Sequence, residues 1–202
     1  MNDMAIVIFH GSFNSLQQIS DFWLPEITRL KQKVIFPQFP VDTWEEVTQN
    51  GENAMPVRQT LDAWLKKFEE YVPEIRQEKE LVFVGHSSGP LFILSTLQKY
   101  QILLKSAVFV SPFLNPLTKP AWQVKEVNKS FYANFDFDKL QELCPKSYSL
   151  YGIDDPYVET ENTLVFADKM KSILVPIEYG GHLNNDKSGK FVTEYCRKAL
   201  ID

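Results

Sequence analysis

Ser87 has the surroundings most typical of a nucleophile in this sequence, because it stands between two glycines in Gly85-His86-Ser87-Ser88-Gly89. In a G-x-S-x-G turn the chain passes sharply from a strand to a helix, and the turn is too tight for side chains at the glycine positions. The apolar run 81–84 before the motif predicts the strand, and the apolar run 91–94 after it predicts the helix. Ser88 is the rival nucleophile, but it has a glycine at only one of the two required positions. The alternative interpretation is a tight turn without chemistry.

A serine hydroxyl needs a general base within hydrogen-bond reach, and that base usually needs an acid to orient it. The sequence offers three histidines. His86 adjoins Ser87 on an extended segment, so its side chain should leave on the opposite side and pack beneath the turn. His10 precedes a glycine in the first loop, where we expect a structural hydrogen bond and a position beside the substrate. His182 follows a predicted strand and two glycines that would let its loop approach Ser87, which makes it the candidate base.

Asp154 and Asp155 follow another predicted strand and are the candidate orienting acids. Proline biases the residue before it toward an extended conformation, so Asp155, which precedes Pro156, should be held in one direction. Asp154 should then be solvated or should cap the helix that begins near Glu159. An Asp-Pro turn that is acidic by chance is the alternative. The order serine, aspartate, histidine along the chain favours the functional interpretation, because it is characteristic of one particular fold.

Six apolar runs predict the strands that must position these residues, and segments of helical periodicity alternate with them. Such alternation predicts parallel βαβ units with right-handed crossovers, and therefore an α/β protein: a three-layer α/β/α sandwich with a mainly parallel sheet. Ligands bind outside the carboxyl ends of such strands, where both Ser87 and His10 should lie. The runs are 5–9, 34–36, 81–84, 107–110, 148–151 and 173–179.

Two segments depart from the simple alternation of strands and helices. An apolar stripe of helical spacing extends from Val57 to Val72, and Pro73 should stop that helix. Residues 113–143 show no clear period, so they form either an irregular flap over the site or a long connection packed on the sheet. As the only segment available to roof the site, they predict a shallow pocket for substrates that are small and largely apolar on the acyl side. The aromatic residues that we expect to contact the substrate there are Trp122, Phe131 and Tyr132.

The length of 202 residues predicts a single domain, residues 1–202, and the composition is that of a soluble globular protein. The formal net charge of −5 argues against nucleic acid or an anionic membrane as the main partner. No stretch approaches the ~20 apolar residues of a membrane span, and residues 1–9 lack the features of an export signal. Cys144 and Cys196 are too few for a disulfide framework, so we expect buried thiols and a cytoplasmic location.

At these residues the sequence resembles the α/β-hydrolase fold, and within it the small serine hydrolases similar to the retinoblastoma-binding-protein-9 family. The resemblance implies a triad of Ser87, His182 and Asp155, on a sheet without the two leading strands of larger hydrolases and without a large cap domain. Two positions depart from the family: the first loop is poor in glycine, and Pro90 replaces the small residue usual after the turn. The motifs that carry the resemblance span nearly the whole chain and are His10-Gly11, Trp23-Leu24-Pro25, the 85–89 turn, residues 131–137 with Leu143-Cys144-Pro145, Asp154-Asp155-Pro156 and Gly181-His182.

The activity that this resemblance implies is cleavage of small ester or amide substrates through an acyl-enzyme on Ser87. The oxyanion would be held by the backbone amide of Ser88 together with that of Ser12 or Phe13. Two other functions stay open: a non-catalytic module that uses the hydrolase fold to bind a protein partner, and an acyltransferase that uses the same triad with an acceptor other than water. The sequence has no glycine-rich phosphate loop and no histidine or cysteine cluster at metal spacing, so it predicts no cofactor and no metal.

Overall fold

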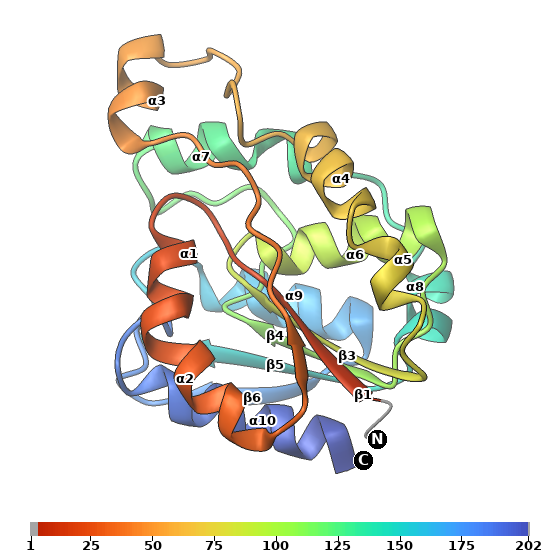
Figure 1. Cartoon of the computed structure of the whole chain (residues 1–202). Coiled ribbons are helices and arrows are strands. Elements are labelled where there is room, and N and C mark those ends of the chain that lie inside the picture. Colours follow the sequence, from red (N-terminus) through yellow and green to blue (C-terminus); the bar gives the residue numbers. More distant parts are fainter. Residues whose placement is uncertain (1–3, 202) are drawn as a thin grey trace.

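A sheet of six parallel strands forms the centre of the computed structural model, which describes residues 4–201 (Figure 1). The strand order is β2-β1-β3-β4-β5-β6, and each strand coincides with one of the six predicted apolar runs. All five pairings are parallel, where the sequence predicted a mainly parallel sheet. The strands are β1 (Met4–Phe9), β2 (Lys33–Ile35), β3 (Glu80–His86), β4 (Ser106–Val110), β5 (Ser147–Gly152) and β6 (Ile173–Ile177).

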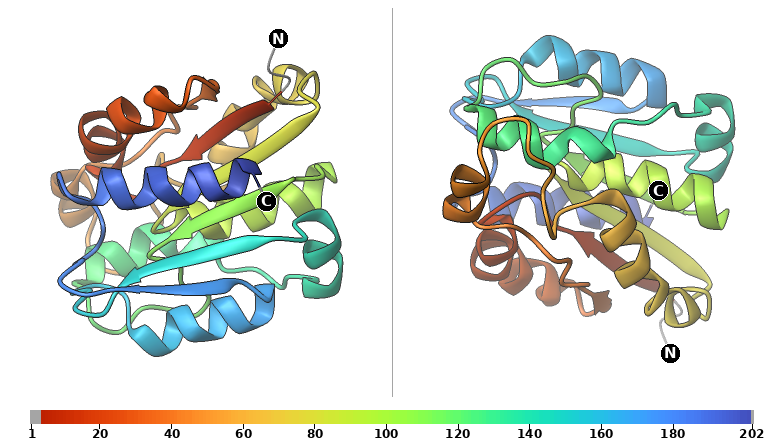
Figure 2. Two further views of the ribbon diagram at one scale, coloured as in Figure 1. Left: turned by 90° about the horizontal axis from the view of Figure 1, so that it is seen from below. Right: turned by 90° about the horizontal axis from the view of Figure 1, so that it is seen from above.

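Helices cover both faces of the sheet, which gives the predicted three-layer α/β/α sandwich (Figure 2). Alternate residues of β1 point to opposite layers: Val7 and Phe9 join one core, and Ile6 and Ile8 join the other. One face carries α1 (Ser15–Gln18), the π-helical turn η1 (Ile19–Trp23), α2 (Leu24–Ile27), the short turn η2 (Thr28–Leu30) and α10 (Ser188–Ile201). The other carries α4 (Leu61–Glu69), α5 (Val72–Ile75), α6 (Gly89–Tyr100), α8 (Phe137–Leu143) and α9 (Thr160–Met170).

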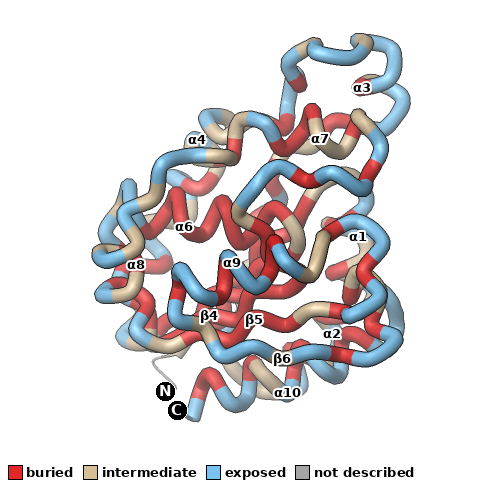
Figure 3. The backbone as a smooth tube through the Cα atoms, turned by 180° about the vertical axis from the view of Figure 1, so that it is seen from behind, coloured by how far each residue is buried: buried red, intermediate tan, exposed pale blue. Residues whose placement is uncertain are grey.

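The helix α6 follows the predicted turn directly and lies at the centre of its layer (Figures 2 and 3). All residues from Gly89 to Leu97 are buried, as expected of a helix that is apolar on every side. Pro90 occupies the first turn, where the backbone nitrogen has no intrahelical acceptor. The proline that departs from the family pattern is therefore compatible with the helix.

The segment between β2 and α4 differs from the predicted single helix. Val57 is exposed, and α4 begins only at Leu61, where the Thr60 side chain accepts a hydrogen bond from the Ala63 amide at 3.2 Å. Pro73 lies in the first turn of α5, so it starts a second short helix instead of ending the first. The prediction missed α3 (Trp44–Asn50), whose start has the capping-box pattern of Thr43 and Glu46.

Residues 113–143 are also more regular than predicted, because they contain α7 (Trp122–Asn128) and the turn η3 (Lys129–Phe131) before α8. Helix α7 lies against α3 beyond the carboxyl ends of the strands, as Figure 1 shows. The segment is therefore partly a cover and partly a connection packed on the sheet. It is too short to form a large cap domain.

Both cysteines, Cys144 and Cys196, are unpaired and buried, as predicted. Burial raises the pKa of each thiol to about 12, so both stay protonated. The described residues contain no helix that is long and apolar enough to cross a bilayer. Within residues 4–201, no group of three or more histidine, cysteine or acidic side chains is arranged to hold a metal ion. The export-signal prediction rests partly on Met1–Asp3, which lie outside the described residues.

Candidate active site

The turn after β3 has the geometry of a nucleophile elbow. Ser87 has a φ of 58°, a left-handed conformation that is uncommon for a residue with a side chain, and its amide donates to the Val110 carbonyl at 2.9 Å. A Cβ atom on Gly85 would lie 2.9 Å from the nitrogen of Pro90, and one on Gly89 would lie 2.6 Å from the carbonyl oxygen of Phe9. Both glycines are therefore required by backbone packing, for the reason that the sequence motif predicted.

His182 and Asp155 form a buried hydrogen-bonded pair. Nδ1 of His182 and Oδ2 of Asp155 are 2.8 Å apart, and the two side chains are 10% and 3% exposed. The other carboxylate oxygen, Oδ1, accepts the amides of Tyr157 at 2.9 Å and Val158 at 3.0 Å. Burial alone would raise the pKa of Asp155, but the hydrogen bond from His182 and these two amides outweigh it and lower the pKa below its ordinary value. The carboxylate is thus held ionised and in one orientation.

Asp154 lies on the outer side of the same turn and is exposed, as predicted. Its Oδ1 accepts a hydrogen bond from the backbone amide of Gly181 at 2.9 Å, and this contact holds the loop that carries His182 in position. The alternative that Asp154 caps the next helix is wrong, because Glu159 occupies the position before α9 and no side chain caps that end. The two neighbouring aspartates therefore act on the same loop, one through its backbone and one through the histidine ring.

The first loop lies directly beside the elbow. A Cβ atom on Gly11 would lie only 2.8 Å from Cβ of Ser87. This proximity follows from the sheet, in which β1 and β3 are neighbours and Phe9 is paired with Gly85. The residues predicted to form the oxyanion hole, Ser12 and Phe13 on this loop and Ser88 after the nucleophile, are thereby brought together. The hydroxyls of Ser12 and Ser88 are 3.4 Å apart.

Gln59 and Asn128 hold the first loop in place, and sequence reasoning did not identify either of them. Nε2 of Gln59 donates to Oγ of Ser12 at 2.6 Å, and that hydroxyl in turn donates to Oδ1 of Asn128 at 3.2 Å. Gln59 and Asn128 are both buried. Neither belongs to a motif, and no local signal in the sequence could have found them, because only the fold brings them to Ser12.

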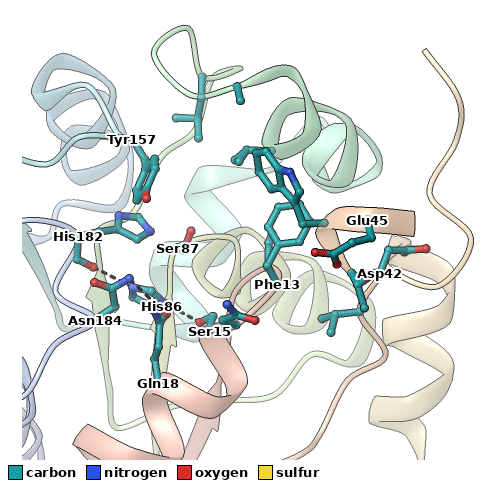
Figure 4. A pocket seen from close by; sticks show the side chains of 18 residues that line it. Phe13, Ser15, Gln18, Asp42, Glu45, His86, Ser87, Tyr157, His182 and Asn184 are labelled. Atoms are coloured by element: carbon teal, nitrogen blue, oxygen red, sulfur yellow. Dashed lines mark hydrogen bonds between the residues drawn. The ribbon is translucent and has the colours of Figure 1, made fainter. Parts of the chain in front are cut away.

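A cavity of about 570 Å³ opens at this end of the sheet, and both Ser87 and His182 face it (Figure 4). Its volume is in the range of small-molecule sites. The ring of Tyr157 lies edge-on to His182, with 5.0 Å between the ring centroids. The lining residues are Ser12, Phe13, Asn14, Ser15, Gln18, Val41, Asp42, Thr43, Trp44, Glu45, His86, Ser87, Leu117, Ala121, Val124, Tyr157, His182 and Asn184.

The strap formed by residues 41–45 makes one wall of the cavity. The ring of Phe13 packs against Trp44, with 5.5 Å between the centroids. Asp42 is buried and accepts three consecutive amides, those of Val57 at 3.1 Å, Arg58 at 2.9 Å and Gln59 at 2.6 Å. The chain from 43 to 56 is therefore a loop closed at its base by one carboxylate. The T-x-x-E pattern of Thr43 and Glu46 is the sequence signal that would have placed α3 here.

None of the four residues predicted to contact the substrate lines this cavity. His10 is fully buried, with Nδ1 donating to the carbonyl of Gly11 at 2.8 Å and Nε2 accepting the amide of Phe39 at 2.9 Å. It therefore has the predicted structural hydrogen bond and does not line the cavity. Phe131 is also fully buried, against Trp64 with 4.8 Å between ring centroids.

Trp122 and Tyr132 are half-buried but lie off the cavity, and Tyr132 packs against the core. Their segment contributes Leu117, Ala121 and Val124 to the wall instead. Tyr132 gains more by packing its ring on the core than by facing the cavity, whereas the aromatic residues that do line the cavity, Phe13, Trp44 and Tyr157, come from other segments.

The fold and the site together define an α/β-hydrolase with a serine nucleophile elbow. A model of the serine hydrolase family matches residues 40–195, and the chain belongs to that family. A search of curated protein sequences finds no match. The chain is therefore a serine hydrolase by family.

Solved structures with the same fold include esterases and lipases. The ydeN gene product of B. subtilis is 16% identical, with a TM-score of 0.71 and 98% of each chain covered. Est1E of Butyrivibrio proteoclasticus, solved with ferulic acid bound, is 15% identical, with a TM-score of 0.64 over 98% of this chain and 90% of that one. A structure from work on the metagenome-derived lipolytic enzymes LipS and LipT is 10% identical, with a TM-score of 0.70 over 100% of this chain and 95% of that one. At these identities the comparisons establish a shared fold.

Proposed function

We propose that this serine hydrolase cleaves small esters or amides through an acyl-enzyme on Ser87, with His182 as the general base and Asp155 as the acid that orients it. The 2.8 Å hydrogen bond between Nδ1 of His182 and Asp155 carries this proposal, because it leaves Nε2 for the nucleophile. The left-handed backbone of Ser87 supports it, since such strain at the end of a strand is typical of a functional turn.

In the first half of the reaction, Oγ of Ser87 attacks the substrate carbonyl carbon while its proton moves to Nε2 of His182. The negative oxygen of the tetrahedral intermediate accepts hydrogen bonds from the backbone amide of Ser88 and from that of Phe13 or Ser12. Each such donor contributes about 3 kcal/mol of transition-state stabilisation. His182 then gives its proton to the leaving group, and the carbonyl re-forms with the acyl group bonded to Ser87.

Water reverses these steps in the second half. Its proton passes to Nε2 of His182 as its oxygen attacks the acyl carbon, and the Ser87 oxygen leaves with that proton. The products are the free acid and the regenerated hydroxyl. Throughout, the ionised carboxylate of Asp155 holds the tautomer of His182 that carries hydrogen on Nδ1, and it stabilises the imidazolium that forms.

The substrates that we propose are neutral or cationic, with a small, largely apolar acyl group. Val41, Leu117 and Val124 provide apolar wall, and the described lining contains no lysine or arginine. The carboxylate of Asp42 is occupied by three backbone amides, whereas Glu45 lies at the rim of the cavity (Figure 4). A substrate carboxylate would meet the negative charge of Glu45 without a cation in the lining to offset it.

Within the family, we propose the narrower relationship to the retinoblastoma-binding-protein-9 group. The tryptophan of its Trp23-Leu24-Pro25 motif contacts the loop that carries His182. Nε1 of Trp23 donates to the carbonyl of Leu183, directly after His182, at 3.2 Å. We also propose a single domain, because both helical layers pack on one sheet, and a cytoplasmic location, because both thiols are unpaired and buried.

Labelling with a fluorophosphonate probe tests the nucleophile. The wild-type chain should be labelled at Ser87, Ser87→Ala should not be labelled, and Ser88→Ala should retain labelling, since the amide of Ser88 and not its hydroxyl is needed. Unlabelled wild-type protein would favour the binding module. Added alcohol or amine acceptors then separate the acyltransferase, which would form new esters or amides, from a hydrolase that releases the free acid.

A further inference from the structure

The ring of His86 lies beneath the nucleophile elbow and touches both loops that complete the site. It is almost fully buried, its centroid is 5.2 Å from that of Trp23 in an edge-on contact, and it is 4.8 Å from that of His182. The predicted packing role is therefore confirmed. The hydrogen bonds of the ring, however, go beyond packing.

A chain of three hydrogen bonds runs through His86, and Figure 4 shows the two that its ring makes. Oγ of Ser15 accepts the amide of Gly11 at 2.7 Å and lies 2.7 Å from Nδ1 of His86. On the other side of the ring, Nε2 of His86 lies 2.9 Å from the backbone carbonyl oxygen of His182. One imidazole thus connects the first loop to the loop that carries the base.

These contacts determine the tautomer of His86. The carbonyl oxygen of His182 can only accept, so Nε2 of His86 must carry hydrogen. Burial, reinforced by the neighbouring His182, lowers the pKa of His86 to about 3, so the ring is neutral and Nδ1 has no hydrogen. Ser15 therefore donates its hydroxyl to Nδ1. A ring in the other tautomer would lose the hydrogen bond to the carbonyl of His182, because neither atom of that contact would then carry hydrogen.

We infer that His86 is a positioning residue for the reaction: through Nε2 it fixes the backbone of His182, and through Ser15 it sets the first loop against the same elbow. This inference rests on the proposed role of His182 as the base. His182 is then held at two points, its ring by Asp155 and its backbone by His86. Small displacements of a base are costly, because proton transfer needs the nucleophile and the base in hydrogen-bond contact.

Two substitutions separate positioning from packing. The side-chain amide of His86→Gln reaches the position of Nε2 and can still donate to the carbonyl of His182. The shorter His86→Asn reaches only the position of Nδ1, so it keeps the contact with Ser15 and loses the one with His182. We expect kcat for p-nitrophenyl acetate to be at least about tenfold lower in the Asn variant than in the Gln variant, with KM within about twofold. Equal kcat values in the two variants would overturn the inference.

A measurement on the wild-type protein does not depend on whether the variants fold. Nitrogen-15 NMR of histidine-labelled protein should show His86 protonated on Nε2 alone, without titration between about pH 6 and 8. A ring protonated on Nδ1, or one that titrates in that range, would refute the assigned hydrogen bonds. The NMR result is independent of Ser87. If the proposed function were wrong, wild type and variants alike would turn over ester no faster than Ser87→Ala.

Discussion

Gly152 and Gly181 touch backbone to backbone, where the strand that leads to the acid meets the loop that carries the histidine. A Cβ atom on Gly152 would lie 2.7 Å from the amide nitrogen of Gly181 and closer still to its carbonyl oxygen. Asp154 bridges the same two segments by accepting the Gly181 amide. The separation of Asp155 and His182 is thus set by main-chain contact as well as by the hydrogen bond between them.

Gly152→Ala should therefore be strongly destabilising and inactive, because main-chain atoms would have to move to accept the methyl group. Gly181→Ala is the matched control. Its φ of 54° makes an alanine cost about 1 kcal/mol or somewhat more, but a Cβ there meets nothing within 4 Å. Urea denaturation and ester turnover measure both effects. A Gly152→Ala protein as stable as Gly181→Ala would contradict the close approach.

Asp155→Asn should fold and lose about 10⁴ in kcat, since an amide cannot hold the required tautomer of His182. Asp154→Asn keeps an oxygen that accepts the Gly181 amide, so it should stay active. Steady-state ester hydrolysis distinguishes the two variants, and circular dichroism checks that both are folded. An inactive Asp154→Asn beside a fully active Asp155→Asn would reverse the assignment.

Glu45→Gln should change selectivity for substrate charge and leave turnover of a neutral ester nearly unchanged. Removing the carboxylate at the cavity should raise kcat/KM for an anionic hemiester relative to its neutral analogue by roughly three- to tenfold. Glu52→Gln makes the same change of net charge in the loop 43–56 but lies off the cavity, so it serves as the control. The same shift in selectivity in both variants would mean that Glu45 does not act at the site.

Stability should fall between neutral and mildly acidic pH because two histidines are buried in neutral form. Desolvation lowers the pKa of His10 to about 4 and, with the adjacent His182, that of His86 to about 3, from an ordinary 6.5. The unfolded chain binds these protons below about pH 6.5 and the folded chain does not, so the stabilisation is complete above that pH and declines as the pH falls toward 4.

Each of these histidines contributes a slope of about 1.4 kcal/mol per pH unit within this window. Urea denaturation at pH 7, 6 and 5 would measure it. His10→Gln should lower stability at every pH, because it disturbs a buried hydrogen-bond pair, and should reduce the slope by about half. A free energy of unfolding that stayed constant from pH 7 to 5 would show that the two rings take up protons as readily in the folded chain as in the unfolded one.

The strands and the residues of the proposed triad could be predicted because each has a local signature in the sequence. A parallel strand buried on both faces is a continuous apolar run, and Ser87 is marked by glycines that backbone packing requires. His182 and Asp155 could be selected because only a few residues of those types follow predicted strands. The preference for Asp155 over Asp154 came from Pro156, and in the structure Asp155 is hydrogen-bonded to Nδ1 of His182.

The walls of the cavity were not predictable from such signals. Trp122 and Phe131 are aromatic whether they face a substrate or the core, so residue type alone could not assign them. Gln59 reaches Ser12 across 47 positions of sequence, and Asn128 reaches it across 116. These contacts exist only after α7 and the segment that precedes α4 have folded against the first loop, and local periodicity carries no information about that step.

The single carboxylate of Asp42 closes the loop of residues 43–56 at its base. Changes within this loop can therefore alter which substrates bind without altering the residues that react. This stretch includes Trp44 and Glu45 of the cavity wall, but none of the proposed triad. Insertions into a surface loop are cheap, because each doubling of loop length costs only about 0.6 kcal/mol. As long as Asp42 keeps its three amides, this loop can change in length and composition while the elbow and the base stay where they are. The fold thereby contains an exchangeable part through which related chains can acquire new substrates.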